Sequence, residues 1–390
     1  MTLVLVRPDG TLLGALRPFP VPTPRWPDAA SVVDGARETH GVAVTVLRLL
    51  DADGVDAAGG SVTYLAETED PVTTAAWHGT LDAQPLRHPW AVPGGPARDL
   101  AWADGAVRAS GRGAIERAEQ VRTWNLSSLW RLRAGGREIW LKAVPPFFAH
   151  EGPLLERLRG GPVPVVIAQA GGRTLLEDIP GENLYDAPLD QLRSMVTLLV
   201  GIQRSWIGRT EELIAVGLPD WRAATLADAI AELVDRVGPE LNGGATDVLA
   251  AFVRDLAARM ASVAAAGLPD TLVHGDFAPG NVRGSGSSLV LLDWGDAGVG
   301  HPLLDMAAFL DRVPDDSVAT VREHWYAEWR AAVAGSQPEV AAALLAPVAA
   351  ARQALIYQRF LDAIEPAEHV YHRSDPARWL YRTAEILRSE

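Results

Sequence analysis

Apolar residues recur along this chain with two different spacings, and the spacing changes near residue 180. Before that point the apolar runs are short and separated by turn residues, which predicts strands. After it, apolar residues recur every three or four positions, which predicts amphipathic helices. We expect strands at 3–6, 42–50, 61–65, 120–124, 129–133, 138–144, 163–167, 173–177, 271–273 and 289–292. We expect helices at 30–40, 97–119, 151–158, 189–206, 225–237 (capped by Thr225), 247–266, 303–313, 317–333, 340–364 and 375–389.

Turn-forming residues set the expected domain boundaries. The segment His88–Ala97, HPWAVPGGPA, carries three prolines and two adjacent glycines, which interrupt any periodic pattern. We therefore expect a small α/β domain at residues 1–95, a mainly β lobe at 97–181 and a helical lobe at 182–390. A length of 390 residues is sufficient for such a multidomain chain.

Composition narrows the class of protein. The net charge of −14 speaks against non-specific nucleic-acid binding, which depends on basic surface. The chain has no cysteine, so disulfides, thiolate metal sites and cysteine nucleophiles are excluded. The N-terminus lacks a basic region before its short apolar run, and we find no uninterrupted apolar run long enough to cross a bilayer. We expect a soluble cytoplasmic protein.

The first domain contains one weak motif. Residues 37–42, RETHGV, faintly resemble the end of a Nudix box. The upstream glycine and glutamates of that motif are missing, so the sequence does not support a metal-dependent pyrophosphatase site. We expect a structural or regulatory domain here.

The segment 271–305 carries the clearest chemical pattern. It reads TLVHGDFAPGNV and, after a short connection, LVLLDWGDAGVGHPLLD. Asp276 and Asn281 follow one apolar strand, and Asp293 follows a second. Transfer of a phosphoryl group from ATP needs a carboxylate that accepts the proton of the attacking hydroxyl, together with hard oxygen ligands for Mg²⁺. The order, spacing and strand context of these residues fit that chemistry.

This pattern, His-Gly-Asp, then Asn, with Asp-Trp-Gly downstream, resembles the aminoglycoside phosphotransferase and choline kinase family. The resemblance covers roughly residues 97–390 and is strongest at 274–305. It implies an α+β, two-lobed, protein-kinase-like fold with a β-rich N-lobe and a helical C-lobe, preceded by the small α/β domain. It also implies ATP, or in some members GTP, as co-substrate together with Mg²⁺.

The resemblance assigns roles to five residues of this segment. Asp276 is expected to orient and deprotonate the acceptor hydroxyl, and a carboxylate that accepts the proton late needs little tuning of its pKa. Asn281 and Asp293 are expected to bind Mg²⁺. His274 is expected to hold the loop by packing and a backbone hydrogen bond. Asp305 is expected to anchor that loop by accepting its N–H groups.

Lys142 is the only lysine in the chain, although lysine and arginine together number 35. It closes the strand at 138–144, where the resemblance implies a lysine that binds the α- and β-phosphates. A compact ammonium suits that position better than a planar guanidinium. Its partner should be an acidic residue on the next helix, with Glu151 as the first choice and Glu156 as the second.

Two further segments are expected to contact the nucleotide. The turn 125–128, Asn-Leu-Ser-Ser, would cover the phosphates, with Ser127 and Ser128 as donors, although it lacks the glycines of protein kinases. The segment 176–179, with Glu177 and Ile179, would form the hinge beside the adenine and bind it through main-chain groups.

Eleven residues separate Asp293 from Asp305, which is too few for a peptide-docking activation segment and favours a small-molecule acceptor. Tyr357, Asp362 and Glu365 are candidate acceptor ligands, since carboxylates suit an aminoglycoside, amino sugar or amino alcohol. The carboxylates could equally form a solvated helix end. We expect an enzyme that binds a nucleotide and a small hydroxylated molecule, with no nucleic-acid or membrane partner. The alternative is a nucleotide-binding pseudokinase, or a regulatory protein that acts through the N-terminal domain.

Overall fold

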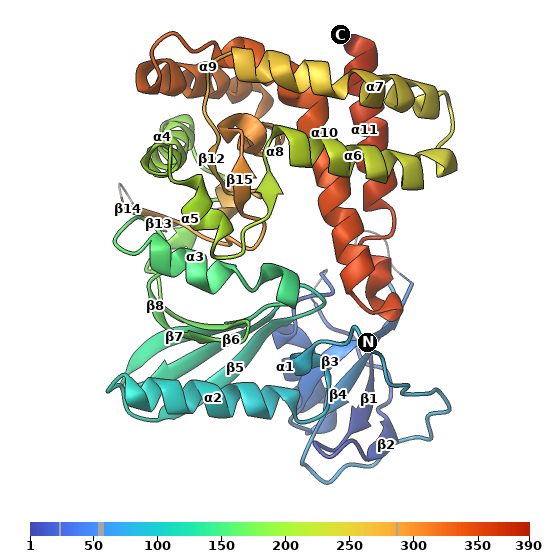
Figure 1. The fold of residues 1–390 in the computed structure, drawn as a ribbon. Helices are drawn as coiled ribbons and strands as arrows, with labels where there is room; N and C mark the ends of the chain where they lie inside the picture. Colours follow the sequence, from blue (N-terminus) through green and yellow to red (C-terminus); the bar gives the residue numbers. More distant parts are fainter. Residues whose placement is uncertain (23–24, 54–57, 286–287) are drawn as a thin grey trace. The chain divides into compact units, whose positions relative to one another are not determined.

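The computed structural model describes residues 1–22, 25–53, 58–285 and 288–390. The described chain forms two compact units (Figure 1). The first unit comprises residues 1–152, 166–178 and 361–373, and the second comprises residues 153–165, 179–360 and 374–390. The small N-terminal domain and the β lobe that we expected thus share one unit. The expected three-part division of the chain stays a prediction.

The first sheet of unit 1 has four strands in the order β2-β1-β4-β3. β1 and β4 pair in parallel, whereas the other two pairs are antiparallel. Val32 and Ala36 of helix α1 share a buried core with Leu3 and Leu5 of β1. The elements are β1 (Thr2–Val6), β2 (Leu12–Ala15), α1 (Ala30–His40), β3 (Thr45–Ala52) and β4 (Val62–Glu67).

The second sheet of unit 1 is antiparallel, with the order β5-β6-β7-β9-β8. Helix α2 lies along this sheet in Figure 1, and its Ala103 and Val107 pack against Leu132 and Leu141. This packing fixes the sheet that carries Lys142. The elements are α2 (Gly95–Ala109), β5 (Ile115–Thr123), β6 (Ser128–Ala134), β7 (Arg137–Ala143), β8 (Val166–Ala170) and β9 (Arg173–Glu177).

Gln120 joins the two sheets of unit 1. This buried side chain on β5 accepts a hydrogen bond from Val46 N at 2.9 Å and donates one to Val46 O at 2.7 Å. A glutamine amide that pairs with both backbone groups of one residue extends the hydrogen bonding of a strand. The N-terminal sheet is therefore bonded to the β lobe, and not merely linked to it by the chain.

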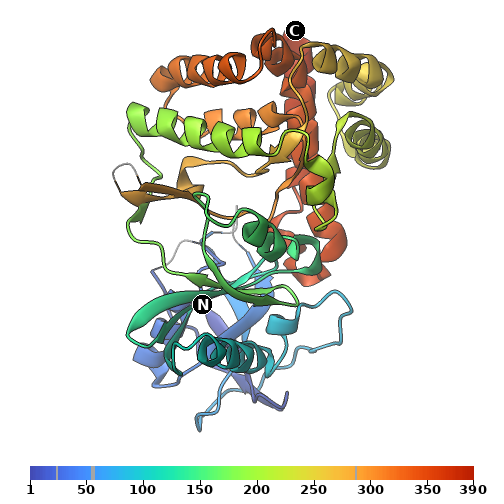
Figure 2. The ribbon, with the colours of Figure 1, turned by 60° about the vertical axis from the view of Figure 1, so that its left-hand side comes forward.

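Unit 2 is mainly helical, with two small sheets that carry the loops of the 271–305 segment. Helices α4 and α9 pack side by side, drawn in light green and orange in Figure 2. The helices are α4 (Leu189–Ser205), α5 (Thr210–Ile214), α6 (Ala223–Val237), α7 (Ala245–Ala265), α8 (Met306–Leu310), α9 (Asp315–Ala332), α10 (Pro338–Ala363) and α11 (Asp375–Ser389). The sheets contain β10 (Glu182–Asn183), β13 (Val282–Ser285) and β14 (Ser288–Leu291), and β11 (Asp220–Trp221), β15 (Gly298–Gly300) and β12 (Thr271–Val273). Helix α3 (Glu151–Arg157) begins in unit 1 and ends in unit 2.

Short 3₁₀ helices complete the chain. They are η1 (Pro89–Ala91), η2 (Pro146–Phe148), η3 (Gly238–Glu240), η4 (Pro279–Asn281), η5 (Pro302–Asp305) and η6 (Pro366–Tyr371). The last of these belongs to unit 1 although both of its flanking helices lie mainly in unit 2.

Several sequence-based boundaries were wrong. The helix expected at 303–313 is a 3₁₀ helix, η5, followed by the short α8, and the strand expected at 163–167 is β8 (Val166–Ala170). The helix expected at 97–119 ends at Ala109, because Gly111 and Gly113 adopt φ angles of 78° and 85°, and β5 then begins. Thr225 does not cap its helix, since α6 begins two residues earlier at Ala223. The short strands β2, β13 and β15 were missed because three or four residues carry too little periodicity to detect.

Among the described residues, α10 is the one helix that is long and apolar enough to cross a membrane by length and composition. However, 67% of its most apolar window is buried inside the protein. A buried core helix of a protein can have the same length and apolar composition as a membrane-spanning helix. The apolar character of α10 is thus explained by packing within the protein.

Candidate active site

Asp276 and Asn281 lie on one loop that follows strand β12. The Asn281 Nδ2 donates to the Asp276 main-chain oxygen at 2.8 Å and to its Oδ2 at 2.9 Å. The amide group of Asn281 thereby orients the carboxylate of Asp276. It also leaves the Asn281 Oδ1 as the atom that can bind a cation.

Asp293 follows β14 and is exposed. Its φ of 59° is the only positive φ of a non-glycine residue in the described chain. Aspartate tolerates this left-handed conformation better than most residues, and such strain concentrates at functional positions. The preceding residue, Leu292, donates its N–H to Asn281 O at 2.7 Å. The two loops are therefore hydrogen-bonded beside their two candidate metal ligands.

The donor set of these loops fits Mg²⁺. The ion prefers hard oxygen ligands, usually one or two carboxylates together with phosphate oxygens and water. Asn281 can offer an amide oxygen, and Asp293 offers an exposed carboxylate. These two residues would hold the ion.

Asp305 is the anchor of the Asp276 loop. Its side chain is 1% exposed and accepts from His274 N at 2.9 Å, Gly275 N at 2.7 Å and Gln203 Nε2 at 3.0 Å. Burial raises its pKa to about 6, although the two backbone N–H groups act in the opposite direction. Asp305 thus fixes the backbone immediately before Asp276.

His274 lies under the same loop and is fully buried. Its Nε2 is 2.8 Å from Leu292 O, and its ring lies 4.6 Å from that of Trp294. The ring therefore joins the Asp276 loop to the Asp293 loop. Its placement matches a structural role better than a catalytic one.

We expect Asp305→Asn to lower the free energy of unfolding by about 2 kcal/mol. The two carboxylate oxygens of Asp305 each accept from one backbone N–H group, whereas asparagine has a single acceptor oxygen, so one of these N–H groups would lose its partner. Urea denaturation at pH 7 measures the change. The exposed Asp255 on α7 supplies the control, since Asp255→Asn should change stability by less than about 0.5 kcal/mol. Equal stability of the Asp305→Asn variant and the wild type would contradict the anchoring role.

The electrostatic surroundings of Asp276 combine opposing effects. Burial raises its pKa, and the nearby charge of Asp293 acts in the same direction. The Arg312 guanidinium, 3.5 Å from Asp276 Oδ1, lowers that pKa. This arginine follows α8 and its side chain is 52% exposed, so solvent screens the pair. In the described chain, Arg312 is nevertheless the side chain that forms an ion pair with Asp276, the candidate base.

Lys142 and Glu151 form a close pair in unit 1. The Lys142 Nζ lies 2.7 Å from Glu151 Oε1, and the side chains are 16% and 5% exposed. Lys142 is on β7, opposite Leu129 of β6. Glu156, the second choice, instead accepts a hydrogen bond from Arg159 at 3.1 Å. The structure thus brings Lys142 together with Glu151, the first of the two expected partners.

The turn between β5 and β6 occurs where we expected a phosphate-covering turn. Both serine hydroxyls are already engaged there. Ser127 Oγ accepts from Trp124 Nε1 at 3.1 Å, and the buried Ser128 Oγ accepts from Trp130 Nε1 at 3.2 Å. In the described part of the chain both serine oxygens act only as acceptors, so either hydroxyl can still donate its proton to a phosphate oxygen.

The hinge segment is held by side chains. Glu177 pairs with Arg112, and Asp178 accepts from Trp140 Nε1 at 2.7 Å. Ile179 O accepts from Arg283 Nε at 2.7 Å, so this carbonyl is already bonded. Main-chain recognition of a base would have to use other groups of the segment.

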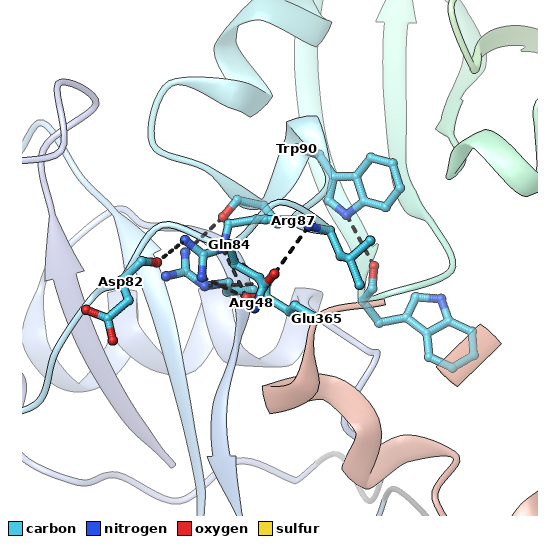
Figure 3. A network of polar contacts seen from close by, with 9 residues as sticks. Arg48, Asp82, Gln84, Arg87, Trp90 and Glu365 are labelled. Atoms are coloured by element: carbon cyan, nitrogen blue, oxygen red, sulfur yellow. Dashed lines mark hydrogen bonds and ion pairs between the residues drawn. The ribbon is translucent and has the colours of Figure 1, made fainter. Parts of the chain in front are cut away.

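The three candidate acceptor ligands are divided between the two units. Tyr357 belongs to unit 2, where burial raises its pKa, whereas Asp362 and Glu365 belong to unit 1. Asp362 is exposed. Glu365 is only 4% exposed and lies between two arginines (Figure 3).

Glu365 has a structural environment that differs from the one we expected. Arg87 binds its carboxylate through Nε at 3.1 Å and Nη2 at 2.7 Å, and Arg48 Nε lies 3.7 Å away. An enclosed carboxylate with two guanidinium partners is already neutralised. This corrects both expectations for Glu365, because it is neither placed as an acceptor ligand nor part of a solvated helix end.

Glu368 lies in the same interior and gives a pH-dependent prediction. Burial, followed by the charge of Glu365, raises the pKa of Glu368 to about 8. A carboxyl group whose pKa is raised on folding binds more protons in the folded state, so its contribution to stability declines as pH rises from about 4.5 to 8. In the wild type this effect should lower the free energy of unfolding by a few kcal/mol as the pH rises. The Glu368→Gln variant should not show this decline.

Urea denaturation of the wild type and the variant at pH 5, 6.5 and 8 tests this prediction. The variant should gain stability relative to the wild type as pH increases. The exposed Glu385 on α11 provides the control substitution, Glu385→Gln, which should give a constant difference. A stability difference for Glu368→Gln that is independent of pH would contradict the prediction.

Unit 2 contains a cavity of about 610 Å³ that begins beside the Asp276 loop. Gln353 lines it and also directs Nε2 toward Gly275 O at 3.4 Å. Small side chains of α10 leave the space open. Its wall carries three carboxylates and two guanidinium groups, from Asp311, Asp315, Glu339, Arg322 and Arg382. A second hollow shares Asp311 and Trp379 with it. The cavity is therefore large enough, and polar enough, for a small organic molecule.

Sequence reasoning missed three polar residues around the Asp276 loop: Gln203, Arg312 and Arg352. Gln203 and Arg352 had a detectable signal, because each is a long polar residue on the apolar face or in the apolar body of a helix. Arg312 had no such signal, since an arginine after a short helix is ordinary.

Comparison with known proteins shows which family the chain belongs to. The model of the phosphotransferase enzyme family matches residues 107–344, which is more than half of the chain. A comparison with curated proteins found no match.

Solved structures share the fold at low identity. The ethanolamine kinase of Plasmodium vivax gives a TM-score of 0.52 at 9% identity, with 70% of this chain and 84% of that chain covered. The GDP complex of aminoglycoside 2'-phosphotransferase-IIIa gives 0.50 at 16%, with 75% and 97% covered. Macrolide 2'-phosphotransferase type I gives 0.50 at 16%, with 74% and 97% covered.

The chain shares the mixed α and β fold of these solved structures, which confirms the predicted fold class. The chain belongs to the phosphotransferase enzyme family. It is therefore a phosphotransferase.

Proposed function

We propose that this protein transfers the γ-phosphoryl group of ATP, with Mg²⁺, to a hydroxyl group of a small molecule. The observation that carries the proposal is the geometry of the Asp276 loop. Asn281 donates a hydrogen bond to the Asp276 carboxylate at 2.9 Å. The main-chain oxygen of Asn281 accepts from the N–H of Leu292, the residue that precedes Asp293. A proton acceptor and two hard oxygen ligands are thereby fixed on neighbouring loops. GTP is the alternative donor.

Each residue then has a defined task. Asp276 orients the acceptor hydroxyl and takes its proton at a carboxylate oxygen as the new bond to phosphorus forms. Asn281 and Asp293 hold the Mg²⁺, which neutralises charge on the phosphates when bound. Lys142 binds phosphate oxygens as a compact cation, and Glu151 fixes the position of its ammonium group. Arg312 supplies a further positive charge beside Asp276.

We propose that the 610 Å³ cavity receives the acceptor, and that the acceptor carries an amine. Asp311 and Asp315 would bind an ammonium group there. Arg312 disfavours a second amine beside the reacting hydroxyl, because like charges repel. This arrangement suits an aminoglycoside, an amino sugar or an amino alcohol whose amine lies away from the hydroxyl that reacts.

The net charge of −14 is compatible with a small cationic acceptor and gives no basis for a nucleic-acid partner. We propose that the enzyme acts in the cytoplasm, where its nucleotide co-substrate is abundant.

A thermal-shift screen tests the proposal. Hydroxylated amines and matched neutral alcohols are added with Mg²⁺ and a non-hydrolysable ATP analogue, and hits go to an ATP-consumption assay with Mg²⁺. A ligand at a hundredfold its Kd adds about 2.7 kcal/mol of apparent stability. Turnover of an amine-bearing alcohol supports the proposal in full. Preference for neutral alcohols would overturn the amine assignment, and absence of Mg²⁺-dependent turnover with every donor would overturn the reaction.

A regulatory role for the N-terminal domain is a second candidate. It is favoured by the buried contacts of Arg48 and Arg87 with Glu365, a residue of the segment that joins α10 to α11 (Figure 3). Removal of residues 1–95 would leave Glu365 buried without its partners, and a loss of folding would then obscure any effect on regulation. Surface substitutions in the N-terminal domain, assayed for acceptor specificity, are the cleaner test.

A further inference from the structure

Helix α10 buries an arginine within its most apolar stretch. The sequence around it reads APVAAARQALIY, and the Arg352 side chain is 1% exposed. Enclosing a guanidinium costs several kcal/mol unless it is paired and hydrogen-bonded. A methionine or leucine would fill the same space without that cost. Arg352 therefore requires polar partners inside the fold.

Those partners are main-chain oxygens of two different loops. Arg352 Nη1 lies 3.5 Å from Gly275 O, and its Nη2 lies 3.4 Å from Asp296 O. Gly275 immediately precedes Asp276, and Asp296 follows Asp293 by three residues. The planar fork of one guanidinium thus spans the loop of the candidate base and the loop of the candidate metal ligand.

The two loops touch where the fork binds. Gly275 has a φ of 91°, and a Cβ added to it would lie 2.0 Å from Asp296 O. Glycine is therefore required here for the close approach. Gly275 N is meanwhile bonded to Asp305, so its peptide groups are held from both sides. Any shift of Arg352 would be transmitted directly to the backbone of Asp276.

The charge of Arg352 is also balanced locally. Burial lowers the pKa of Arg352, and the charge of Arg359 acts in the same direction, whereas the charges of Asp305, Asp296 and Asp276 raise it. Its guanidinium carbon lies 4.9 Å from the centre of the Trp221 ring. Arg359, also on α10, lies over the same ring at 4.5 Å. No hydrogen bond from Arg359 to the Gly275 or Asp296 loop occurs among the described residues, which makes it a natural control.

We propose that Arg352 is a positioning residue, which sets the distance between the Asp276 and Asp293 loops through its two carbonyl contacts. The inference rests on the proposed function, because it concerns the geometry of the same two loops. A residue with this role affects the rate of the folded enzyme, since a displacement of about 1 Å at a reacting group can cost about a hundredfold in rate. A residue that only fills the core would affect stability alone.

The test compares Arg352→Met, Arg352→Lys and Arg359→Met in the full chain. Each is assayed for kcat, for the KM of the nucleotide and for the Mg²⁺ concentration at half-maximal rate, below its own melting temperature. We expect kcat to fall roughly tenfold to a hundredfold in Arg352→Met, with a raised Mg²⁺ requirement and a nearly unchanged nucleotide KM. Arg352→Lys should recover part of kcat, because an ammonium can reach one carbonyl but not both. Arg359→Met should stay within about twofold of the wild type, since surface-facing losses of packing act mainly on stability.

Several results would overturn the inference. One is an Arg352→Met enzyme that is less stable but has the wild-type kcat. Another is an equal fall in kcat for Arg359→Met, which would assign the effect to Trp221. If Arg352→Met does not fold, Arg352→Lys decides, and a kcat equal to the wild-type value refutes the role.

Failure of the proposed function would look different. In that case the wild type itself would show no Mg²⁺-dependent turnover with any acceptor. Failure of this inference alone would leave an active wild type and active Arg352 variants.

Discussion

Asp276→Asn should lower kcat by about a thousandfold, while the affinity for the nucleotide remains near that of the wild type. A positioned general base contributes roughly a hundredfold to ten-thousandfold, and asparagine cannot accept the proton of the hydroxyl. The substitution keeps the shape of the side chain, and the amide oxygen can still accept a hydrogen bond from Asn281. The loss should therefore be confined to the transfer step. Steady-state kinetics with the acceptor found by screening, together with nucleotide binding by calorimetry, measures both quantities.

The exposed Asp255 on α7 provides the matched control, because Asp255→Asn makes the same chemical change outside both loops. That variant should retain the wild-type kcat. Turnover of Asp276→Asn at the wild-type rate would exclude Asp276 as the proton acceptor. A joint loss of nucleotide binding would indicate instead that its charge is needed to hold the metal.

Asp293→Asn should weaken binding of the Mg²⁺–nucleotide complex by at least about a hundredfold and reduce kcat strongly. Loss of groups that merely orient metal ligands already costs about ten- to a hundredfold in affinity, so loss of a charged ligand should cost at least as much. Asparagine is preferred to alanine here because Asp293 has a φ of 59°, a conformation that asparagine tolerates and alanine does not. The variant therefore tests the charge without adding backbone strain.

Binding of the nucleotide with and without Mg²⁺ separates the two contributions. The variant should bind the metal-free nucleotide as the wild type does, and lose the gain that Mg²⁺ provides. An unchanged Mg²⁺-dependent gain in affinity would refute the metal assignment of Asp293. Asp255→Asn again serves as the control for a lost carboxylate.

Much of the fold followed from local periodicity. Helices α1 and α11 and strand β12 have the bounds predicted for them, because each has a clear apolar face or a short apolar run between turn residues. The prediction failed where periodicity was weak or misleading. The helix assigned to 97–119 ran across Gly111 and Gly113, whose backbone conformations end it.

The candidate site was predictable in part, for a related reason. Asp276 and Asp293 follow apolar strands, and Lys142 ends one, so their positions depend on local structure. Glu151 lies only nine residues from Lys142, so the pair also forms within a short stretch of chain.

Other parts of the site depend on contacts between distant segments. Asp305 meets Gln203 across a separation of 102 residues, and Arg352 meets Gly275 across 77. Glu365 meets Arg87 across 278 residues. No periodic pattern encodes which distant partner a buried charge will find, because that choice is made by the packing of whole elements. This is why Glu365 was assigned to the acceptor rather than to the interior of unit 1.

The sequence by itself determined the family, the enzyme class and the mixture of strands and helices, and it identified the candidate loop residues, since these depend on residue type and short-range spacing. Only the tertiary structure decided how the loops are held. Burial makes an unpaired charge costly, so each enclosed ionic group must find partners wherever the fold places them. For Asp305 and Arg352 those partners lie on the loops of Asp276 and Asp293.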